Sequence, residues 1–417
     1  HYHNHRGYFE SAELLSRPPP GNVEVASVAD FTGDGLLDAV VGGPKQLPGL
    51  YEGGEGRFEK QGIAILTRTL AQPKAMTAGD TDSDGDLDLW VGQYKVPYVN
   101  GQMPTPYYDA NDGYPAYLLR NEGGGRFTDV TTPMGLAQKR HRRTYSASFA
   151  DLDSDGDLDL LVVSDFAGID LYYNDGAGRF EDVTSRLVGE ASTFGMSHAF
   201  GDYNDDGRLD IYVVGMSSTT ARRLDHLGVG RDDFPDHHAR RSAMGFGNRI
   251  YLAGDEGSFL VAPETAQVAR TGWSWGVASS DLDNDGDDEI YVANGHMSGD
   301  SALDYCSTFW THDIYTGSSQ PDPKLASFFN SVIGDWHGSG KSWNGFEHNR
   351  LFLNQKNTAF SDIGFLLGLG SEADGRNVLV DDIDLDGRPD LLIAEVTSKD
   401  QLRIRIMHNR WKNSGNW

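Results

Sequence analysis

The residues best suited to chemistry in this sequence are carboxylates at alternate positions of a short loop. In the stretch 150–163, Asp151, Asp153 and Asp155 precede Gly156, and Asp159 ends a nine-residue run that leads into apolar residues. Carboxylates this close repel one another by about 1 kcal/mol per pair at 4 Å even in water. Such a run therefore implies a cation, and an all-oxygen donor set around a tight glycine turn favours Ca²⁺ over zinc or copper.

The loop differs from an EF-hand in two respects. Position twelve, where an EF-hand has Glu, is Val162, and short apolar runs flank the loop where an EF-hand has helices. We therefore expect a strand–loop–strand calcium site. The alternative, an acidic turn that binds nothing, is disfavoured because the pattern recurs.

The nine-residue pattern occurs six times, starting at residues 30, 80, 151, 202, 281 and 382. Six loops with the same glycine predict about six structural Ca²⁺ ions, held by positions one, three, five and nine. Thr32 replaces one carboxylate of the first loop. The predicted ligands are Asp30, Asp34 and Asp38; Asp80, Asp82, Asp84 and Asp88; Asp151, Asp153, Asp155 and Asp159; Asp202, Asn204, Asp206 and Asp210; Asp281, Asp283, Asp285 and Glu289; and Asp382, Asp384, Asp386 and Asp390.

The formal net charge of −27 comes almost entirely from these loops. They hold 27 of the 62 acidic residues and two of the 35 basic ones, so the rest of the chain is close to neutral. Nucleic-acid binding is disfavoured, because the only basic run is the short stretch 139–143. No apolar run is long enough to span a membrane, and Cys306 is the only cysteine, so no intrachain disulfide can form. We expect an extracytoplasmic location, where such loops fill with Ca²⁺.

Each loop has the same surroundings, which predict an all-β fold. A strand of small residues enters the loop, an apolar strand leaves it, a third strand ends in a glycine-rich turn, and a fourth begins with an aromatic residue, as at 146–184. Four short strands per repeat describe the blade of a β-propeller. We count six blades; seven are possible if 294–348 hides a degenerate one. The stretch 7–14 resembles a fourth strand, so we expect it to close the last blade.

The organisation is that of one propeller domain, residues 1–410, with long insertions near 93–116, 215–247 and 294–348. All three join the second and third strands of a blade, so they belong on the face opposite the calcium loops. Long loops inside compact domains are usually functional or disordered, and these carry unusual side chains. This face is therefore where we expect a ligand.

Unusual side chains gather in these insertions and in the connections between blades. A cleft of His, Arg, Trp and Tyr suits binding of a sugar or peptide, a transition metal, or acid–base chemistry. The structural alternatives are that Trp273 and Trp275 pack between blades and that 140–143 is a solvated face. The candidate catalytic residues are His198, Arg143, Tyr145 and His296, and the candidate ligand-binding residues are Trp273, Trp275, Arg142, Arg376 and His337.

The chain resembles the FG-GAP or VCBS repeat propellers, which include the integrin α-subunit head. The six loops and the element Gly-x-Phe-x-Asp-Val-Thr at 125–131 and 178–184 carry this resemblance. The stretches 272–278, 290–295 and 349–354 look more narrowly like the ASPIC and UnbV family, to which cartilage acidic protein belongs. That resemblance implies a small further C-terminal domain, of which 411–417 looks like the start.

Together these patterns favour an extracytoplasmic, calcium-stabilised propeller that binds a carbohydrate or protein partner through its insertion-bearing face. The alternative is an enzyme of the lyase, hydrolase or cyclase type that acts on a small-molecule substrate at the same face. In that case the insertion histidines are candidates to hold a second, transition metal. A propeller fold hosts both kinds of function, so the sequence leaves both open.

Overall fold

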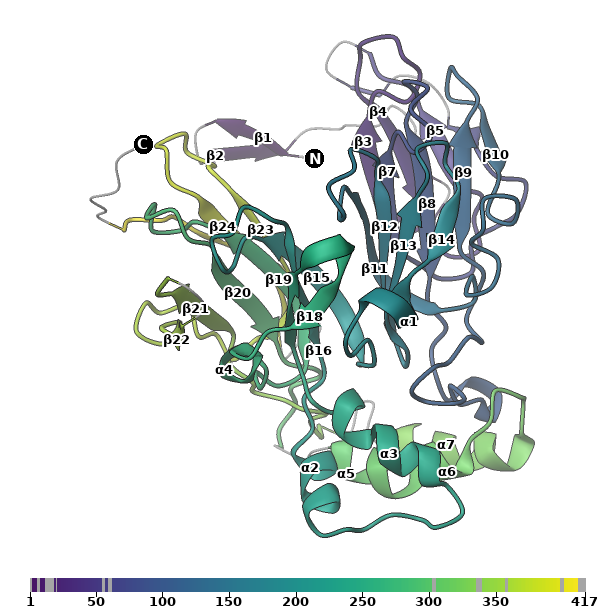
Figure 1. Cartoon of the computed structure of the whole chain (residues 1–417), viewed down its shortest axis with the longest axis vertical. Coiled ribbons are helices and arrows are strands. Elements are labelled where there is room, and N and C mark those ends of the chain that lie inside the picture. The colour runs from purple at the N-terminus through teal and green to yellow at the C-terminus, as the bar shows by residue number, and fades with distance from the viewer. Residues whose placement is uncertain are drawn as a thin grey trace. The chain divides into compact units, whose positions relative to one another are not determined.

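The computed structural model describes residues 2–5, 8–11, 19, 21–54, 57–58, 62–301, 305–334, 340–356, 359–397 and 401–411. The chain folds into two compact units (Figure 1). The first unit comprises residues 1–95, 110–165 and 169–191, and the second comprises 96–109, 166–168 and 192–417. None of the described helices is both long and apolar enough to cross a membrane.

The first unit holds three four-stranded antiparallel sheets, each a meander in chain order, and a separate hairpin. The first strands of the three sheets lie side by side. The hairpin is β1 (Tyr2–His5) and β2 (Tyr8–Ser11), and the sheets are β3 (Val25–Ala29), β4 (Asp38–Gly42), β5 (Gly49–Tyr51) and β6 (Ile63–Ala64); β7 (Pro73–Gly79), β8 (Asp88–Gln93), β9 (Tyr117–Asn121) and β10 (Phe127–Asp129); and β11 (Arg143–Ala150), β12 (Asp159–Asp165), β13 (Gly168–Asn174) and β14 (Phe180–Asp182).

The second unit repeats this arrangement, again with neighbouring first strands side by side. Its last sheet has three strands among the described residues. The sheets are β15 (Gly195–Gly201), β16 (Asp210–Gly215), β17 (Arg249–Ala253) and β18 (Phe259–Val261); β19 (Ser274–Ser280), β20 (Glu289–Asn294), β21 (Arg350–Asn354) and β22 (Phe360–Asp362); and β23 (Asp374–Asp381), β24 (Asp390–Val396) and β25 (Leu402–Met407).

These sheets are the six blades of a β-propeller, as the repeats predict. The described part of 294–348 contains helices and no strand beyond the end of β20, so six blades is the correct count. The expected closing strand is not confirmed: β2 pairs with β1, and the described pairing of β25 is with β24.

The second strand of a blade is the most deeply buried. All six residues of β8 and all six of β20 are buried, because each strand has a neighbour on both edges and a blade against each face. The core between blades is built from these strands. Trp90 of β8, Leu160 of β12 and Phe180 of β14 belong to one such cluster in the first unit.

Most of the described residues of the three insertions form a mostly helical cap within the second unit. η1 packs on α7, and α2 packs on α3 (Figure 1). We call residues 96–109, 217–247 and 297–345 the insertion cap. Its elements are η1 (Val99–Gly101), α2 (Thr219–His226), α3 (Pro235–Met244), α5 (Cys306–Thr308), η3 (Phe309–Asp313), α6 (Ile314–Thr316) and α7 (Pro323–Gly334); outside it lie α1 (Thr184–Leu187), η2 (Asp255–Gly257) and α4 (Thr265–Val268).

Candidate metal loops and insertion face

The six acidic loops share one backbone geometry. In the fourth loop, Asp202 accepts hydrogen bonds from the backbone N–H of Asp206 at 3.0 Å and of Gly207 at 2.7 Å, and Asp206 accepts one from Arg208 N–H at 2.9 Å. Position six is a glycine with φ of 79° to 99° in every loop. Nothing lies within 4 Å of a Cβ placed there, so glycine is needed for its backbone angle and not for space.

The carboxylate at position nine is held by the protein itself. Asp159 is fully buried and accepts backbone N–H groups from Leu152 and Asn174, both at 2.9 Å. Burial raises the pKa of Asp159 to about 7, and burial likewise raises the pKa of Glu289 in the fifth loop to about 8. Position nine therefore ties the loop to the third strand of its own blade.

Positions one, three and five lie close together in three of the six loops. In the second, fifth and sixth loops, one oxygen from each of the three carboxylates lies within 4.8 Å of the others. In the third loop the group is Asp151, Asp153 and Asp159. Burial, followed by the charges of Asp285 and Asp281, raises the pKa of Asp283 to about 6. Negative charge is thus concentrated where water is scarce.

Each loop also has at least one buried oxygen without a hydrogen-bond donor among the described residues. In five loops position three supplies one, and in the third loop position one does; the fifth loop has two more, at Asn284 and Asp287. A buried acceptor without a donor costs about 1–3 kcal/mol, so its recurrence at one place points to a missing partner. The residues therefore fit a bound cation. The atoms at positions three and one are Thr32 Oγ1, Asp82 Oδ1, Asp151 Oδ1, Asn204 Oδ1, Asp283 Oδ1 and Asp384 Oδ1.

The opposite end of the first strand carries a β-bulge in five of the six blades. In β19 the residues Ser274 and Gly276 pair with consecutive residues of β20, which leaves Trp275 as the extra residue. Tyr145 in β11 and Arg376 in β23 are extra in the same way. A bulge redirects a side chain out of the regular alternation. Three of the predicted site residues therefore occupy the same position, the extra residue of a β-bulge.

Four of the predicted residues in the second unit lie together. The indole planes of Trp273 and Trp275 are 3° apart with centroids at 6.1 Å, and the His296 ring lies 4.6 Å from one and 5.1 Å from the other. The Arg376 guanidinium lies 5.1 Å from the Trp275 centroid and donates to Gly295 O at 2.7 Å. Trp343 of the insertion cap lies 5.5 Å from His296. The two indoles and His296 are half-buried, so part of each ring is open to a ligand.

The basic run 139–143 lies in the first unit and is not a solvated face. Arg142 is 6% exposed and donates to Asp170, which also pairs with Lys139 at 2.7 Å. Arg143 is fully buried and donates through both Nε and Nη2 to Asp112 at 2.9 Å. The interpretation as a solvated face was wrong because the sequence does not show these acidic partners, which lie 28 and 31 residues away.

The remaining candidates occupy separate places. Tyr145 stacks on Tyr94 in the first unit with centroids at 4.2 Å. In the second unit, His198 lies on β15 beside Phe200, and burial lowers its pKa to about 4, so the ring is neutral at pH 7. His337 falls outside the described residues.

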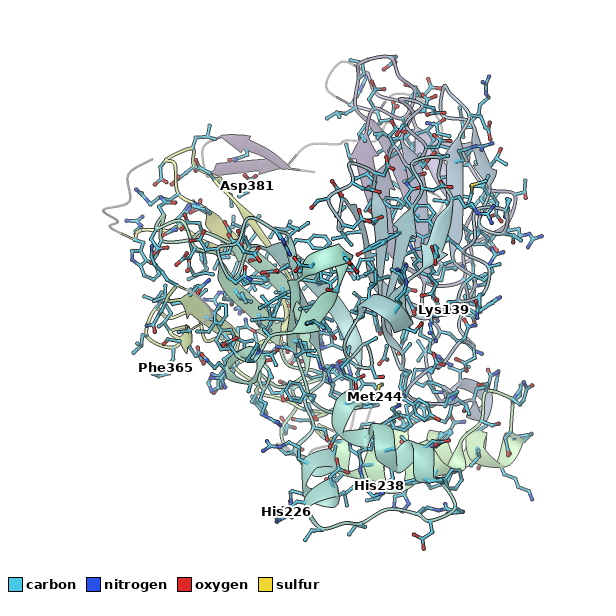
Figure 2. The ribbon with its side chains drawn as sticks, in the orientation of Figure 1. Lys139, His226, His238, Met244, Phe365 and Asp381 are labelled. Atoms are coloured by element: carbon cyan, nitrogen blue, oxygen red, sulfur yellow. The ribbon has the colours of Figure 1, made fainter. Side chains whose placement is uncertain are left out.

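The insertion histidines within the described residues do not join any group of three possible metal ligands. His226 and His238 lie on α2 and α3 of the insertion cap (Figure 2), and His238 Nε2 is 3.9 Å from Asp225. The histidine that does join such a group is His408, with Asp384 and Asp390 of the sixth loop. Its Nδ1 lies 3.1 Å from Asp390 and 3.5 Å from Asp384.

Comparison with known protein families gives a match to the FG-GAP-like repeat over residues 30–91, 109–162 and 151–213. The chain contains FG-GAP-like repeats. The matched stretches cover the loops of the first four blades, and the fold extends the same blade through the rest of the chain. The fold is thus a β-propeller with FG-GAP-like repeats in its first four blades. The comparison does not reach the narrower ASPIC and UnbV family.

Two solved structures are among those similar to this propeller. The Vibrio cholerae biofilm matrix protein Bap1 matches at 13% identity and a TM-score of 0.37, over 81% of this chain and 38% of the Bap1 chain. BBS1N, from its complex with ARL6DN, matches at 11% identity and a TM-score of 0.33, over 94% of each chain. The chain thus spans well under half of Bap1. No curated protein matches significantly.

The blades also contain a recurring asparagine, which the sequence analysis did not identify as a functional residue. Asn121, at the end of the third strand of the second blade, donates through Nδ2 to Phe31 O of the preceding loop at 2.9 Å and to Leu87 O of its own loop at 3.3 Å. The recurrence of Asn at the end of the third strand could have indicated this role from the sequence. Asn174, Asn354 and Asn409 donate to position two of the preceding loop in the same way, at Thr81, Tyr203 and Leu282.

Proposed function

We propose that this β-propeller acts outside the cytoplasm, is stabilised by Ca²⁺, and binds a carbohydrate through the insertion-bearing face of its second unit. The observation that carries the binding function is the pair of half-buried, parallel indoles of Trp273 and Trp275 beside His296 and Arg376. Ligand sites are typically apolar and aromatic surfaces with a few fixed polar groups. This cluster has that composition.

A carbohydrate suits these side chains better than a folded protein does. The flat faces of indoles pack on the C–H faces of pyranose rings, while sugar hydroxyls take the polar groups at the rim. His296 and the Arg376 guanidinium supply such groups. Trp275 projects from a bulge, so its position is fixed by backbone pairing on both sides. A rigid aromatic loses little entropy on binding.

The carbohydrate site is tested by binding to a panel of immobilised oligosaccharides, followed by titration calorimetry with the best ligand. We expect Trp273→Ala and Trp275→Ala each to weaken binding by about tenfold or more, as loss of a central aromatic contact does. Phe365→Ala is the matched control, because Phe365 (Figure 2) is an aromatic side chain of the second unit that is 82% exposed and follows the fourth strand β22 of its blade. Binding of a protein partner with no glycan binding would overturn the proposed ligand class.

The calcium part of the proposal is supported by the buried position-three oxygens and the grouped carboxylates. When bound, Ca²⁺ supplies positive charge that these oxygens otherwise lack. Asp82, Asp84 and their counterparts in the other loops are the residues that would hold it. Affinities of extracellular calcium modules fall at about 10⁻⁴–10⁻³ M, which suits the proposed location.

Removal of the ion has a calculable effect. A site filled at a hundred times its dissociation constant contributes about 2.7 kcal/mol, and about 1 kcal/mol shifts the melting temperature of a unit this size by about 2–4 °C. Two such sites in one unit account for more than about ten degrees. We expect excess EDTA to lower the melting temperature by at least that amount and added Ca²⁺ to restore it. An unchanged melt would refute a structural role for calcium.

An enzyme at the same face is supported less well. Of the four candidate catalytic residues, Arg143 is fully buried and engaged by Asp112, and Tyr145 stacks on Tyr94. His296 is the candidate that lies among the ligand-binding residues, beside the two indoles. We therefore place His296 in binding.

A further inference from the structure

A cavity of about 390 Å³ lies in the second unit beside the aromatic cluster. Three segments form most of its walls: the start of α2, the residues just before β19, and the stretch 344–350 that leads into β21; Cys306 of α5 also lines it. The first two contribute Ser218, Thr219, Arg222 and Arg270, so hydroxyls and guanidinium groups line one side. The size suits a small ligand or one part of a larger one.

Two of the lining arginines have no acidic partner within ion-pair distance among the described residues. Arg222 lies on α2, and Arg270 lies before β19 with its guanidinium 5.3 Å from the Phe246 ring. Burial and the positive charge of Arg222 lower the pKa of Arg270. The third lining arginine, Arg350, differs from these two, because it forms an ion pair in which its Nη1 is 2.6 Å from Asp362. Both guanidinium groups are exposed, so their two positive charges are open to an anion that enters the cavity.

The carboxylate that also lines the cavity, Glu347, is engaged by backbone and side-chain donors. Its Oε2 accepts the backbone N–H of Trp273 at 2.6 Å, and its Oε1 accepts from Asn344 at 3.4 Å. Gly272 permits this approach, because its φ is +126° and a Cβ there would lie 2.5 Å from the Glu347 carboxylate. Glu347 therefore fixes the backbone at Trp273 and joins the cavity to the aromatic cluster.

The start of α2 adds further positive potential. Ser218 caps the helix by accepting the N–H of Ala221 at 2.9 Å, and the first turn contains no acidic residue. The partial positive charge of a helix N-terminus favours anions. This potential acts on the same space as the two unpaired guanidinium groups.

We infer that the cavity is an oxyanion site, built by Arg222, Arg270 and the start of α2, for a sulfate, phosphate or carboxylate group. Because Glu347 links it to Trp273, the oxyanion would be a substituent of the saccharide whose ring packs on the indoles. The ligand class is then an acidic saccharide. The identity of the molecule that carries the oxyanion rests on the proposed function; the anion site itself rests on the cavity and its arginines.

The anion site is tested without any saccharide, by calorimetry on the full chain in calcium-containing buffer at constant ionic strength. Sodium sulfate, sodium methyl phosphate and sodium acetate are the three probes, and the order of their affinities identifies the preferred oxyanion. Charged hydrogen bonds contribute about 1.5–3 kcal/mol each, so we expect Arg270→Gln and Arg222→Gln each to weaken binding by about tenfold or more. Arg223→Gln is the control, because Arg223 is an equally exposed arginine on α2 that does not line the cavity.

A second titration compares a neutral oligosaccharide with its sulfated counterpart. We expect tighter binding of the sulfated form, with the difference lost in Arg270→Gln. Saturable sulfate binding with no saccharide binding would support the oxyanion site and overturn the carbohydrate function. Saccharide binding with no saturable oxyanion binding, or with both arginine variants unchanged, would overturn the oxyanion site alone.

Discussion

Asp313 offers the sharpest test of the insertion cap, because it is a buried carboxyl group outside every acidic loop. It is 1% exposed, and its Oδ2 accepts the hydroxyl of Tyr98 at 3.1 Å and that of Tyr305. Tyr98 comes from the insertion near 93–116, whereas Tyr305 and Asp313 come from the one near 294–348. Its Oδ1 has no donor among the described residues. The carboxyl group therefore joins two insertions. The free energy required to bury it depends on whether it is charged.

The cost can be worked out from the pKa. Burial raises the pKa of Asp313 from 3.8 to about 6, against smaller opposing effects of Tyr98 and His312. A pKa raised by folding means that stability is fully present below about pH 3.8 and is lost as the pH rises through about 6. Each pKa unit corresponds to about 1.36 kcal/mol, so the loss is about 1 kcal/mol at pH 4.5 and about 3 kcal/mol at pH 7.5.

The perturbation is Asp313→Asn, which removes the charge and keeps the shape. Urea unfolding followed by tryptophan fluorescence, at fixed Ca²⁺ and at about pH 4.5 and 7.5, gives the free energy of unfolding of wild type and variant. We expect the variant to gain about 2 kcal/mol relative to wild type between the two pH values. Titration of the acidic loops cancels in this difference. Asp232→Asn, at an exposed position of the insertion cap, is the control; an equal pH dependence in wild type and Asp313→Asn would refute the reasoning.

Three further substitutions test the loops and the blades. Asp82→Ala should lower the calcium content by about one ion per chain in elemental analysis, whereas Asp86→Ala, at position seven of the same loop, should not; equal contents would exclude position three as a ligand. Asn121→Ala leaves two backbone carbonyls without their donor and should lower the free energy of unfolding by about 1–3 kcal/mol in urea. Arg143→Lys cannot keep both hydrogen bonds to Asp112 and should destabilise the first unit by about 2 kcal/mol, with a neutral result showing the pair to be dispensable.

The fold was predictable because its signal is repeated. Each blade must place an acidic loop between its first and second strands and a glycine turn after its third, so six copies define the strand order without reference to long-range contacts. The helices of the insertion cap gave no such repeat. They depend on contacts between insertions, such as Tyr98 with Tyr305 and Phe329, which lie more than 200 residues apart.

The candidate site was predicted only in part, for a related reason. The sequence predicted Trp273, Trp275, His296 and Arg376 as site residues, and the structure brings them together and adds Trp343. Trp343 has no periodic signal because it comes from an insertion. Arg142 and Arg143 were offered as site residues, yet both are buried in ion pairs whose acidic members are distant in sequence. A cluster of cations in a sequence does not reveal its counterions.

The two ends of the first strand differ in how much their residues vary from blade to blade. At the acidic-loop end, the buried carboxylate of position nine fixes the register with backbone hydrogen bonds, so the residues there repeat from blade to blade. At the other end, the bulge admits an extra residue whose side chain does not take part in the regular alternation, and it is Tyr145, Trp275 or Arg376 in different blades. The strands β19 and β23 lie side by side, and their bulges place Arg376 on Trp275. The same β-bulge thus carries a different side chain in different blades, whereas the acidic loops are alike in all six.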